Sequence, residues 1–293
     1  LAELAEPNHH QEIVIRDGKR WTPRVVTYEN HANETNIEIR RNGVYLITGG
    51  LGDIGLAMAE HLIGLGAGTL YLLGRNAPAD LKNNKHPKLE ALLNLQRRGA
   101  RIVPIKADVA DASAMQNVFT RIQNESGAIH GVIHSAGVIH DGLIANKNVQ
   151  DVSLTLRPKI TGARVLADLL KTVTPDFLIL YSSATSVFGN IGQCDYAVAN
   201  SYLDQLAHKL SQQGIPTRSL NWSLWSDIGM GKALVDVLER RGFTAISNQQ
   251  AMACFDASLQ SKQPQLVIAK YAGQGPQASV TSPLPLSSNK ASA

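Results

Sequence analysis

From Val44 onward, short apolar runs alternate with longer stretches in which apolar residues recur at helical spacing. The apolar runs are rich in β-branched and aromatic residues, which favour buried strands. This alternation predicts an α/β fold built on a doubly wound parallel sheet. The expected strands cover residues 44–48, 69–73, 102–107, 131–134, 177–182, 217–222 and 266–269. The expected helices cover residues 55–65, 87–98, 113–125, 158–171 and 196–212.

The two ends of the chain do not follow this alternation. Near the N-terminus, Asp17 and Gly18 separate two β-prone arms, which predicts a hairpin that needs a partner to pack on. From Gly273 onward, a composition of Gly, Pro, Ser, Gln and Ala predicts a flexible tail. The chain starts at Leu1 without a methionine, which suggests a piece of a longer protein. We therefore expect three parts, at residues 1–40, 41–272 and 273–293.

Composition narrows the class of protein. A chain of 293 residues with 44% hydrophobic content can bury one large α/β core. Its net charge of +4 comes without a block of basic residues, which argues against nucleic-acid binding. No apolar run approaches the roughly 20 residues that span a bilayer, and Cys194 and Cys254 have no metal-site spacing. We expect a cytoplasmic protein that binds no nucleic acid, membrane or metal.

A glycine-rich turn lies between the first expected strand of the sheet and the first expected helix. Glycines there permit a tight turn and a close approach of the backbone to a pyrophosphate, and the helix N-terminus adds unpaired N–H groups. This context is typical of a Rossmann-like dinucleotide site, with an ordinary glycine-rich turn as the alternative. The residues expected to contact the dinucleotide are Thr48, Gly49, Gly50, Gly52, Asp53, Ile54 and Gly55.

Arg75 follows the second strand of the sheet, at the position that faces the adenosine ribose in this fold. An acid there would bind the 2′-hydroxyl of NAD, whereas an arginine pairs with the 2′-phosphate of NADP. We therefore expect NADPH as cofactor, with a solvated surface arginine as the alternative. Further cofactor contacts are expected at the ends of the next two strands, from Asp108, Val109, Ser135, Ala136 and Gly137.

Three polar residues are spaced to meet at one pocket, since Ser183 lies thirteen residues before Tyr196 and Asn200 lies four after it. On a helix, Tyr196 and Asn200 share one face, while Ser183 ends a buried strand. The set suits carbonyl reduction, with Tyr196 as proton donor and Ser183 holding the carbonyl oxygen. A phenolate gains from a nearby cation, and Lys159 is the best candidate because position 200 is not a lysine. Taken singly, each of these residues is more often structural.

These motifs resemble those of the ketoreductase domains of modular polyketide synthases, members of the short-chain dehydrogenase/reductase superfamily. In that family, lysine and asparagine exchange places relative to ordinary short-chain reductases, which accounts for Lys159 and Asn200. The resemblance covers about residues 10–270. The segments that carry it are residues 48–55, 134–138, 159–162, 181–183, 193–200 and 219–222.

The resemblance implies NADPH-dependent reduction of a β-ketoacyl group to a β-hydroxyacyl group. The substrate would be carried on the phosphopantetheine arm of an acyl carrier protein, among neighbouring domains of a synthase. The resemblance also implies that residues 1–40 are the remnant of a structural subdomain and that residues 41–272 form the catalytic domain. Two alternatives stay open: a free-standing short-chain reductase of small ketones, and a catalytically silent scaffold or epimerising domain.

Stereochemistry follows from the same resemblance. Family members with an aspartate in the loop after the fourth strand tend to give the D-alcohol, and the opposite type carries a tryptophan eight residues before the tyrosine. Here Asp141 is present and position 188 is a phenylalanine, which implies a B-type domain with a D-configured product. Residues 227–247 resemble the mobile lid over the substrate cleft, with a plain amphipathic helix as the alternative. The residues expected at the substrate are Asp141, Phe188, Gln193 and Met230.

Overall fold

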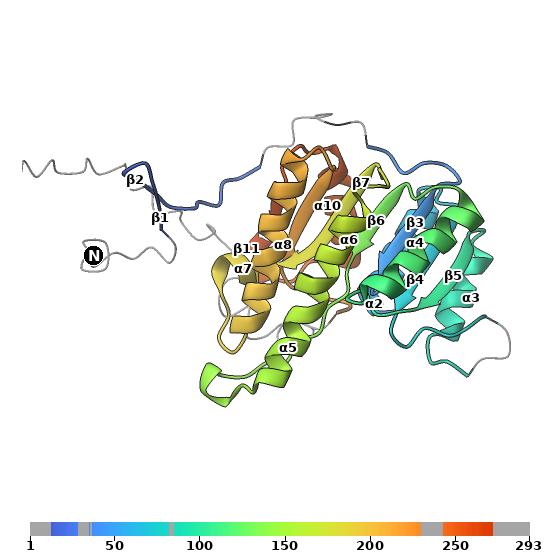
Figure 1. Ribbon diagram of the computed structural model, residues 1–293, viewed down its shortest axis with the longest axis horizontal. Coiled ribbons are helices and arrows are strands. Elements are labelled where there is room, and N and C mark those ends of the chain that lie inside the picture. Colours follow the sequence, from blue (N-terminus) through green and yellow to red (C-terminus); the bar gives the residue numbers. More distant parts are fainter. Residues whose placement is uncertain (1–12, 29–34, 36, 82–84, 230–242, 272–293) are drawn as a thin grey trace, which may run out of the picture. The chain divides into compact units, whose positions relative to one another are not determined.

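The computed structural model describes residues 13–28, 35, 37–81, 85–229 and 243–271. The strands of its main sheet are β3 (Val44–Thr48), β4 (Thr69–Gly74), β5 (Arg101–Lys106), β6 (Gly131–His134), β7 (Phe177–Ser183), β8 (Thr217–Trp222) and β10 (Gln265–Ile268). These seven strands are parallel and lie in the order β10-β8-β7-β6-β3-β4-β5 (Figure 1). The expected fold class is confirmed, because this is the strand order of a Rossmann-like doubly wound sheet. A separate antiparallel pair joins β9 (Phe243–Thr244) and β11 (Lys270–Tyr271).

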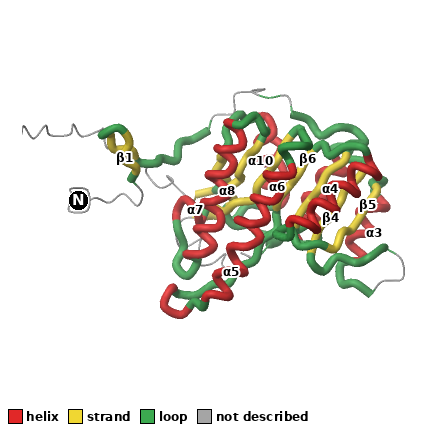
Figure 2. The backbone as a smooth tube through the Cα atoms, in the orientation of Figure 1, coloured by secondary structure: helices red, strands yellow, loops and turns green. Residues whose placement is uncertain are grey.

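Helices cover both faces of the sheet (Figure 2). They are α2 (Asp53–Gly64), α3 (Leu89–Arg97), α4 (Ala112–Ser126), α5 (Val149–Arg157), α6 (Ala163–Leu169), α7 (Thr185–Phe188), α8 (Cys194–Gln212) and α10 (Asn248–Gln260). On one face, α4, α6 and α8 bury Phe119, Leu166 and Leu203 against the strands. On the other face, α2, α3 and α10 form a second core that includes Leu92 and Phe255. The central strands are therefore apolar on both sides, which is why they appear in the sequence as unbroken apolar runs.

The helix expected at residues 158–171 begins nine residues earlier, at Val149. Asn148 caps this start, because its side chain accepts a hydrogen bond from the Asp151 N–H at 2.8 Å. Pro158 has no N–H and crowds the preceding turn, and a π-helical turn, η2 (Pro158–Gly162), forms there before α6 continues the helix. Lys159 lies within this turn rather than near the start of a regular helix.

Helix α10 has no counterpart among the expected elements. A capping box starts it: Ser247 Oγ accepts from the Gln250 N–H at 3.2 Å, and the Gln250 side chain accepts from the Ser247 N–H at 3.0 Å. Ala251, Phe255 and Leu259 form its buried face. The serine three residues before a glutamine was therefore a usable signal in the sequence.

The N-terminal hairpin consists of β1 (Val14–Arg16) and β2 (Lys19–Trp21). Asp17 and Gly18 turn the chain with φ angles of 50° and 69°, the left-handed conformations that a two-residue hairpin turn requires. The chain divides into two compact units, one of residues 30–272 and one of residues 1–29 and 273–293, and the hairpin belongs to the second. Every residue of its two strands is exposed. The tail expected from residue 273 lies outside the described residues.

Candidate active site

The glycine-rich turn crosses from β3 to α2 at the carboxyl edge of the sheet. The turn has no room for side chains: a Cβ on Gly55 would lie 2.4 Å from the Gly49 carbonyl oxygen, and one on Gly49 would lie 2.7 Å from the Ala136 amide nitrogen. Gly49 also has a φ of 70°, which glycine adopts without strain. Gly52 caps α2 without a side chain. The first N–H groups of α2 therefore have no partner within the helix and form a cradle suited to a phosphate.

The other residues expected at this turn differ in their surroundings. Thr48 is fully buried at the end of β3. A Cβ on Gly50 would lie 2.8 Å from a backbone carbonyl oxygen, so this position is also restricted to glycine. Asp53 opens α2 half-exposed, and its carboxylate pairs with Lys88 Nζ at 2.8 Å. Ile54, partly buried, packs against the core formed by α2, α3 and α10.

His134 joins the end of β6 to β3 and to the π-helical turn. Its Nε2 lies 3.1 Å from the Pro158 carbonyl oxygen, and its Nδ1 lies 2.7 Å from Thr48 Oγ1. Because a carbonyl only accepts, Nε2 carries the proton and Nδ1 accepts from the Thr48 hydroxyl. Burial lowers the pKa of His134 to about 3, and the charge of Lys159 acts in the same direction. A neutral histidine with both nitrogens engaged is a structural bridge between these elements.

Arg75 is exposed directly after β4 and makes no ion pair within the described part of the chain. Asp108, after β5, pairs with the Arg157 guanidinium at 3.1 Å. Val109 is buried, and a Cβ on Gly162 would lie 2.7 Å from Val109 Cγ1, so the π-helical turn packs directly on it. Arg75 is thus available to a bound anion, while Asp108 already has a cationic partner.

The small residues after β6 bring the backbone close to Lys159. Ser135 Oγ donates to the Thr48 carbonyl oxygen at 2.8 Å. Ala136 is partly buried and packs against the core under α4, α6 and α8. A Cβ on Gly137 would lie 3.0 Å from Lys159 Cε. Larger residues at these positions would push the strand end away from the lysine.

Tyr196 and Ser183 approach one another from α8 and β7. Tyr196 lies in the first turn of α8, and Ser183 is the last residue of β7. Burial raises the pKa of the Tyr196 phenol above its ordinary value, and hydrogen bonding with Asn200 and Ser183 only partly opposes this shift. The phenol therefore keeps its proton at neutral pH, as a proton donor must. Ser183 Oγ itself donates to Thr185 Oγ1 at 3.1 Å.

Lys159 lies against the same tyrosine although the two are 37 residues apart in sequence. Its side chain is only 4% exposed, and Nζ lies 5.6 Å from the centre of the Tyr196 ring. Nζ also donates to the Tyr181 carbonyl oxygen at 2.7 Å. Burial lowers the pKa of Lys159 to about 8, against the opposing attraction of Asp204. The π-helical turn thus presents a desolvated ammonium group to the phenol.

Asn200 lies one turn along α8 from Tyr196 and is fully buried. Its Nδ2 donates to the Tyr196 carbonyl oxygen at 2.7 Å, which holds the first turn of the helix. Its Oδ1 has no hydrogen-bond partner within the described residues. A buried acceptor in this state is suited to a donor from a bound molecule such as water.

Three of the four residues expected at the substrate lie in the described part of the chain, in α7, directly before α8 and in the loop after β6. Gln193, the residue before α8, donates from Nε2 to Asp141 Oδ1 at 3.0 Å and accepts from Asn190 Nδ2 at 3.0 Å. Asp141 itself is exposed. Phe188 ends α7 and is partly buried. Met230 and most of the expected lid lie outside the described residues.

Sequence reasoning missed a buried ion pair beside Tyr196. Lys147 Nζ lies 2.8 Å from Asp195 Oδ1, and the two side chains are 5% and 2% exposed. Burial on its own would raise the pKa of Asp195, but hydrogen bonds from Lys147 and from the Tyr196 N–H outweigh it and lower that pKa. The pair joins residues 48 positions apart, and neither belongs to a motif of recognisable spacing, so the sequence carried no signal for it.

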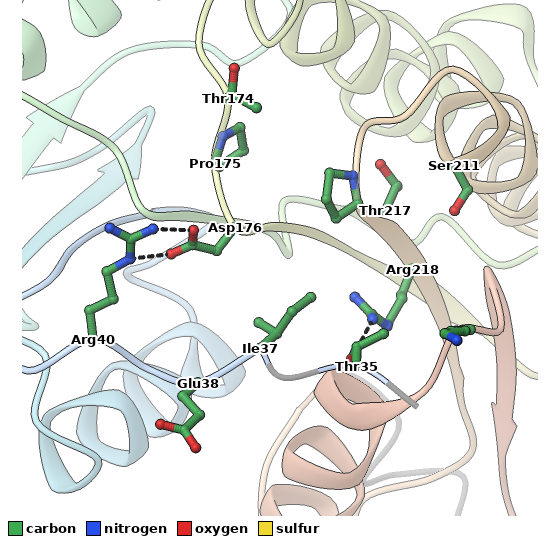
Figure 3. Close-up of a pocket in the computed structure, with 12 residues that line it drawn as sticks. Thr35, Ile37, Glu38, Arg40, Thr174, Pro175, Asp176, Ser211, Thr217 and Arg218 are labelled. Atoms are coloured by element: carbon green, nitrogen blue, oxygen red, sulfur yellow. Dashed lines mark hydrogen bonds and ion pairs between the residues drawn. The ribbon is translucent and has the colours of Figure 1, made fainter. Parts of the chain in front are cut away.

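A cavity of about 650 Å³ lies at the opposite edge of the sheet, by the amino ends of β7 and β8 (Figure 3). Arg40 and Asp176 form an ion pair on one side of the cavity, and on another side Arg218 donates a hydrogen bond to Thr35 Oγ1. Strand β7 runs from this cavity at Phe177 to the other edge of the sheet at Ser183. The groups that can reduce a carbonyl therefore lie away from this cavity.

In the described ranges of the chain, no helix is long and apolar enough to span a membrane. Those ranges also contain no group of three or more His, Cys, Asp or Glu side chains that could hold a metal ion.

The family model for the KR (ketoreductase) domain matches residues 43–227. The chain belongs to the KR domain family. The KR domain is 33% identical over 268 residues to a phenolphthiocerol/phthiocerol polyketide synthase of Mycobacterium tuberculosis, a match that covers 87% of this chain and 14% of that protein. It is 34% identical over 237 residues to polyketide synthase PksM of Bacillus subtilis, covering 78% of this chain and 5% of that synthase. The expected resemblance to polyketide synthase KR domains is confirmed.

Solved ketoreductases share the fold of this KR domain. The ketoreductase from the first module of phoslactomycin biosynthesis in Streptomyces superposes with a TM-score of 0.81 at 29% identity, covering 90% of this chain and 61% of that chain. An N-terminal ketoreductase from the macrolactin assembly line gives a TM-score of 0.73 at 30% identity, covering 86% of this chain and 48% of that chain. This KR domain thus spans less than two-thirds of each solved chain and a small share of each synthase.

Proposed function

We propose that this KR domain reduces the β-keto group of an acyl thioester to a β-hydroxyl group, with NADPH as the reductant. The observation that carries the proposal is the buried Lys159 ammonium, 5.6 Å from the centre of the Tyr196 ring. Carbonyl reduction needs a proton donor and hydrogen bonds at the oxygen where negative charge develops. Tyr196 is the donor in this proposal, and Ser183 holds the carbonyl oxygen.

NADPH, when bound at the glycine-rich turn, supplies the hydride that adds to the β-carbon. The Tyr196 hydroxyl transfers its proton to the carbonyl oxygen, so the C=O group becomes a C–OH group and a phenolate remains on the enzyme. An unperturbed tyrosine has a pKa of about 10, so this phenolate needs an adjacent positive charge. Lys159 supplies that charge, while Asn200 holds Tyr196 in place through its backbone carbonyl.

The choice of NADPH over NADH rests on Arg75. Its guanidinium is exposed beside the turn and is suited to bidentate pairing with a 2′-phosphate. The turn itself supports a dinucleotide, because Gly49 and Gly55 pack so closely against neighbouring backbone that neither position has room for a Cβ, as the tight turn of a dinucleotide site requires. The remaining cofactor contacts that we propose are Thr48, Gly50, Gly52, Asp53, Ile54, Asp108, Val109, Ser135, Ala136 and Gly137.

We propose as substrate a β-ketoacyl group on the phosphopantetheine arm of an acyl carrier protein within a synthase. The curated relatives above are polyketide synthases, in which this chain matches one short part of a much longer protein. The net charge of +4 suits an acidic carrier. We propose residues 1–40 as the remnant of a structural subdomain, 41–272 as the catalytic domain and 273–293 as a linker or tail.

The proposed product is the D-configured alcohol of a B-type domain. Two features support this outcome: the aspartate after β6 is retained as Asp141, and position 188 is a phenylalanine rather than a tryptophan. Gln193 holds Asp141 through hydrogen bonds from Nε2 to Oδ1 and Oδ2, at 3.0 and 3.1 Å. Met230 is proposed as an apolar contact to the acyl chain.

The function is tested by incubating the protein with NADPH and a β-ketoacyl pantetheine thioester and following cofactor oxidation. We expect reduction by the unmodified protein, mainly to the D-alcohol by chiral chromatography. Tyr196→Phe removes the proton donor and should lower the rate by about 100-fold or more, the usual contribution of a positioned general acid. NADPH affinity should be unchanged, because the glycine-rich turn is intact.

Tyr202→Phe is the matched control, since Tyr202 lies on the same helix and packs against the core. It should reduce the thioester at the rate of the unmodified protein. No NADPH oxidation by the unmodified protein would refute the reductase function and favour a silent domain. An unchanged rate in Tyr196→Phe would refute the role of the tyrosine, and mainly L-product would refute the B-type assignment.

A further inference from the structure

Lys147 and Asp195 form an ion pair in a setting where charged side chains are rarely found. Their side chains are 5% and 2% exposed, with 2.8 Å between Nζ and Oδ1. Lysine and aspartate are almost never fully buried unless they are paired, because each charge loses its hydration. Asp195 Oδ2 has no partner within the described residues, so the carboxylate depends on the few contacts that Oδ1 makes.

Both partners are attached to groups of the proposed active site. Asp195 Oδ1 accepts a hydrogen bond from the Tyr196 N–H at 2.9 Å and so fixes the start of α8 at the proton donor. Lys147 Nζ also donates to the carbonyl oxygen of His140, the residue before Asp141. One ammonium group therefore connects the backbone at the aspartate proposed for stereocontrol with the helix turn that holds the proton donor.

Two further contacts join the same two loops. The Gly142 N–H donates to the Gly192 carbonyl oxygen at 2.9 Å, and Gln193 Nε2 donates to Asp141 Oδ1 at 3.0 Å. Together with the ion pair, these contacts form the loop clasp. It crosses between residues 140–147, after β6, and residues 192–196, at the start of α8.

Stability alone is a poor explanation for the ion pair. Replacing a buried ion pair by apolar residues of similar size is often neutral or stabilising, because the desolvation of both charges offsets their attraction. Directional contacts, in contrast, fix geometry, and a small displacement of a reacting group can lower a rate about 100-fold. The two backbone attachments of the pair lie one residue from Asp141 and at Tyr196 itself.

We propose that Lys147 is a positioning residue that, through Asp195 and the His140 carbonyl, sets the geometry of Tyr196 and Asp141 relative to one another. The proposal rests on the proposed function, since it assigns a cause to the rate and stereochemistry of that reaction. Lys147 does not contact the reacting atoms in this proposal. Its loss therefore affects turnover and product configuration more than cofactor binding.

The test compares Lys147→Met, Lys147→Arg and the unmodified protein for kcat, NADPH dissociation constant, product ratio and melting temperature. Lys147→Met should lower kcat by about tenfold or more, with an eroded excess of the D-alcohol, because Tyr196 and Asp141 lose their common anchor. NADPH affinity should stay within about twofold, since the cofactor turn lies on other elements. Lys147→Arg keeps the charge and should restore part of the rate and of the stereochemical excess.

Lys171→Met is the matched control, because Lys171 pairs with Asp168 at 2.6 Å with both side chains more than half exposed. It should leave kcat, product ratio and melting temperature unchanged. A Lys147→Met protein that binds NADPH and has the kcat and product ratio of the unmodified protein would overturn the proposal. If Lys147→Met fails to fold, Asp195→Asn, which keeps the shape and removes the charge, is judged by the same criteria.

Hydrogen exchange separates failure of this proposal from failure of the proposed function. In Lys147→Met, backbone amides at residues 140–147 and 192–196 should exchange about tenfold faster, whereas those of Lys171→Met should not change. This readout needs no substrate. Unchanged exchange in both loops would overturn the loop clasp, even if the protein is a reductase. If the unmodified protein does not reduce the thioester, the proposed function is refuted, whereas faster exchange in Lys147→Met would still support the loop clasp.

Discussion

Burial of Lys159 places a desolvated ammonium charge beside Tyr196, which the proposed reaction uses, but it lowers the stability of the fold. The ammonium group lies beside Tyr196 with a pKa lowered to about 8 from an ordinary 10.5, chiefly because burial removes its hydration. At neutral pH the folded protein still carries that desolvated charge. A shift of this size corresponds to roughly 3 kcal/mol of destabilisation below pH 8, at about 1.4 kcal/mol per pKa unit.

Lys159→Met should therefore stabilise the fold while it removes reduction. The folded lysine loses its proton near pH 8 and the unfolded lysine near 10.5, so the unmodified protein gains stability as pH rises between these values. We expect the variant to be more stable by about 2 kcal/mol at pH 7, after allowing for the lost hydrogen bond to Tyr181. The difference in free energy of unfolding between the variant and the unmodified protein should narrow between pH 8 and 10.5. Urea unfolding across this range measures it, and a less stable variant at pH 7 would contradict the interpretation.

Arg75 gives a prediction about cofactor choice. Arg75→Ala should weaken NADPH binding by about 10- to 100-fold, the range for a charge-assisted hydrogen bond to phosphate, and leave NADH binding unchanged. Fluorescence titration with both cofactors measures the two constants in one protein. Equal weakening of NADPH and NADH binding would mean that Arg75 stabilises the glycine-rich turn and does not bind the 2′-phosphate.

The sequence predicts residues that share a helix face or end a strand, but it does not predict ion pairs between loops. Ser183, Tyr196 and Asn200 were found because two lie on one helix at fixed spacing and the third ends a strand. Lys147 and Asp195 could not be found, because their pairing depends on how two loops pack and not on a local period.

Helix α2 contains two glycines with opposite roles. Gly55 lies in its first turn, where a Cβ would be 2.4 Å from the Gly49 carbonyl oxygen, and Gly64 ends the helix, where a Cβ would meet nothing within 4 Å. Gly55→Ala should destabilise the protein by about 1–3 kcal/mol through overpacking and should weaken NADPH binding, because the phosphate cradle must move.

Gly64→Ala is the control within the same element. It should stabilise the protein by about 0.5–1 kcal/mol, since alanine loses less conformational entropy in a helix than glycine. Thermal unfolding and NADPH titration of both variants give the comparison. If Gly55→Ala binds NADPH with the affinity of the unmodified protein, the turn does not approach the cofactor.

At the element scale, most strands were predicted to within a residue or so because they contain short apolar runs bounded by polar or glycine residues, as in β3 and β7. The π-helical turn was not predicted, since a proline within a helical pattern indicates a break but not the geometry that replaces it. This turn is what brings Lys159 to Tyr196. The sequence therefore indicated which residues could form the candidate site, but not the π-helical turn that places Lys159 beside Tyr196.

At the scale of the whole molecule, residues 30–272 contain both cores of the sheet, while every residue of the hairpin strands is exposed. A protein of residues 30–272 should therefore unfold within about 2 °C of the full chain, the shift expected for less than about 1 kcal/mol. Differential scanning calorimetry of both proteins measures this. A markedly lower melting temperature would show that the N-terminal segment contributes to the fold of the larger unit.

The strand order has a consequence for synthesis of the chain. β3 lies between β4 and β6, so one edge of β3 pairs with residues 69–73, and its other edge pairs with residues 131–134, which are synthesised later. β6, β7, β8 and β10 then add in chain order, each on the newest edge. A nascent chain that has passed residue 106 but not residue 131 exposes the apolar edge of β3, which is open to pairing with another chain. Translation through this interval therefore leaves the growing polypeptide with an unpaired apolar strand edge that favours aggregation.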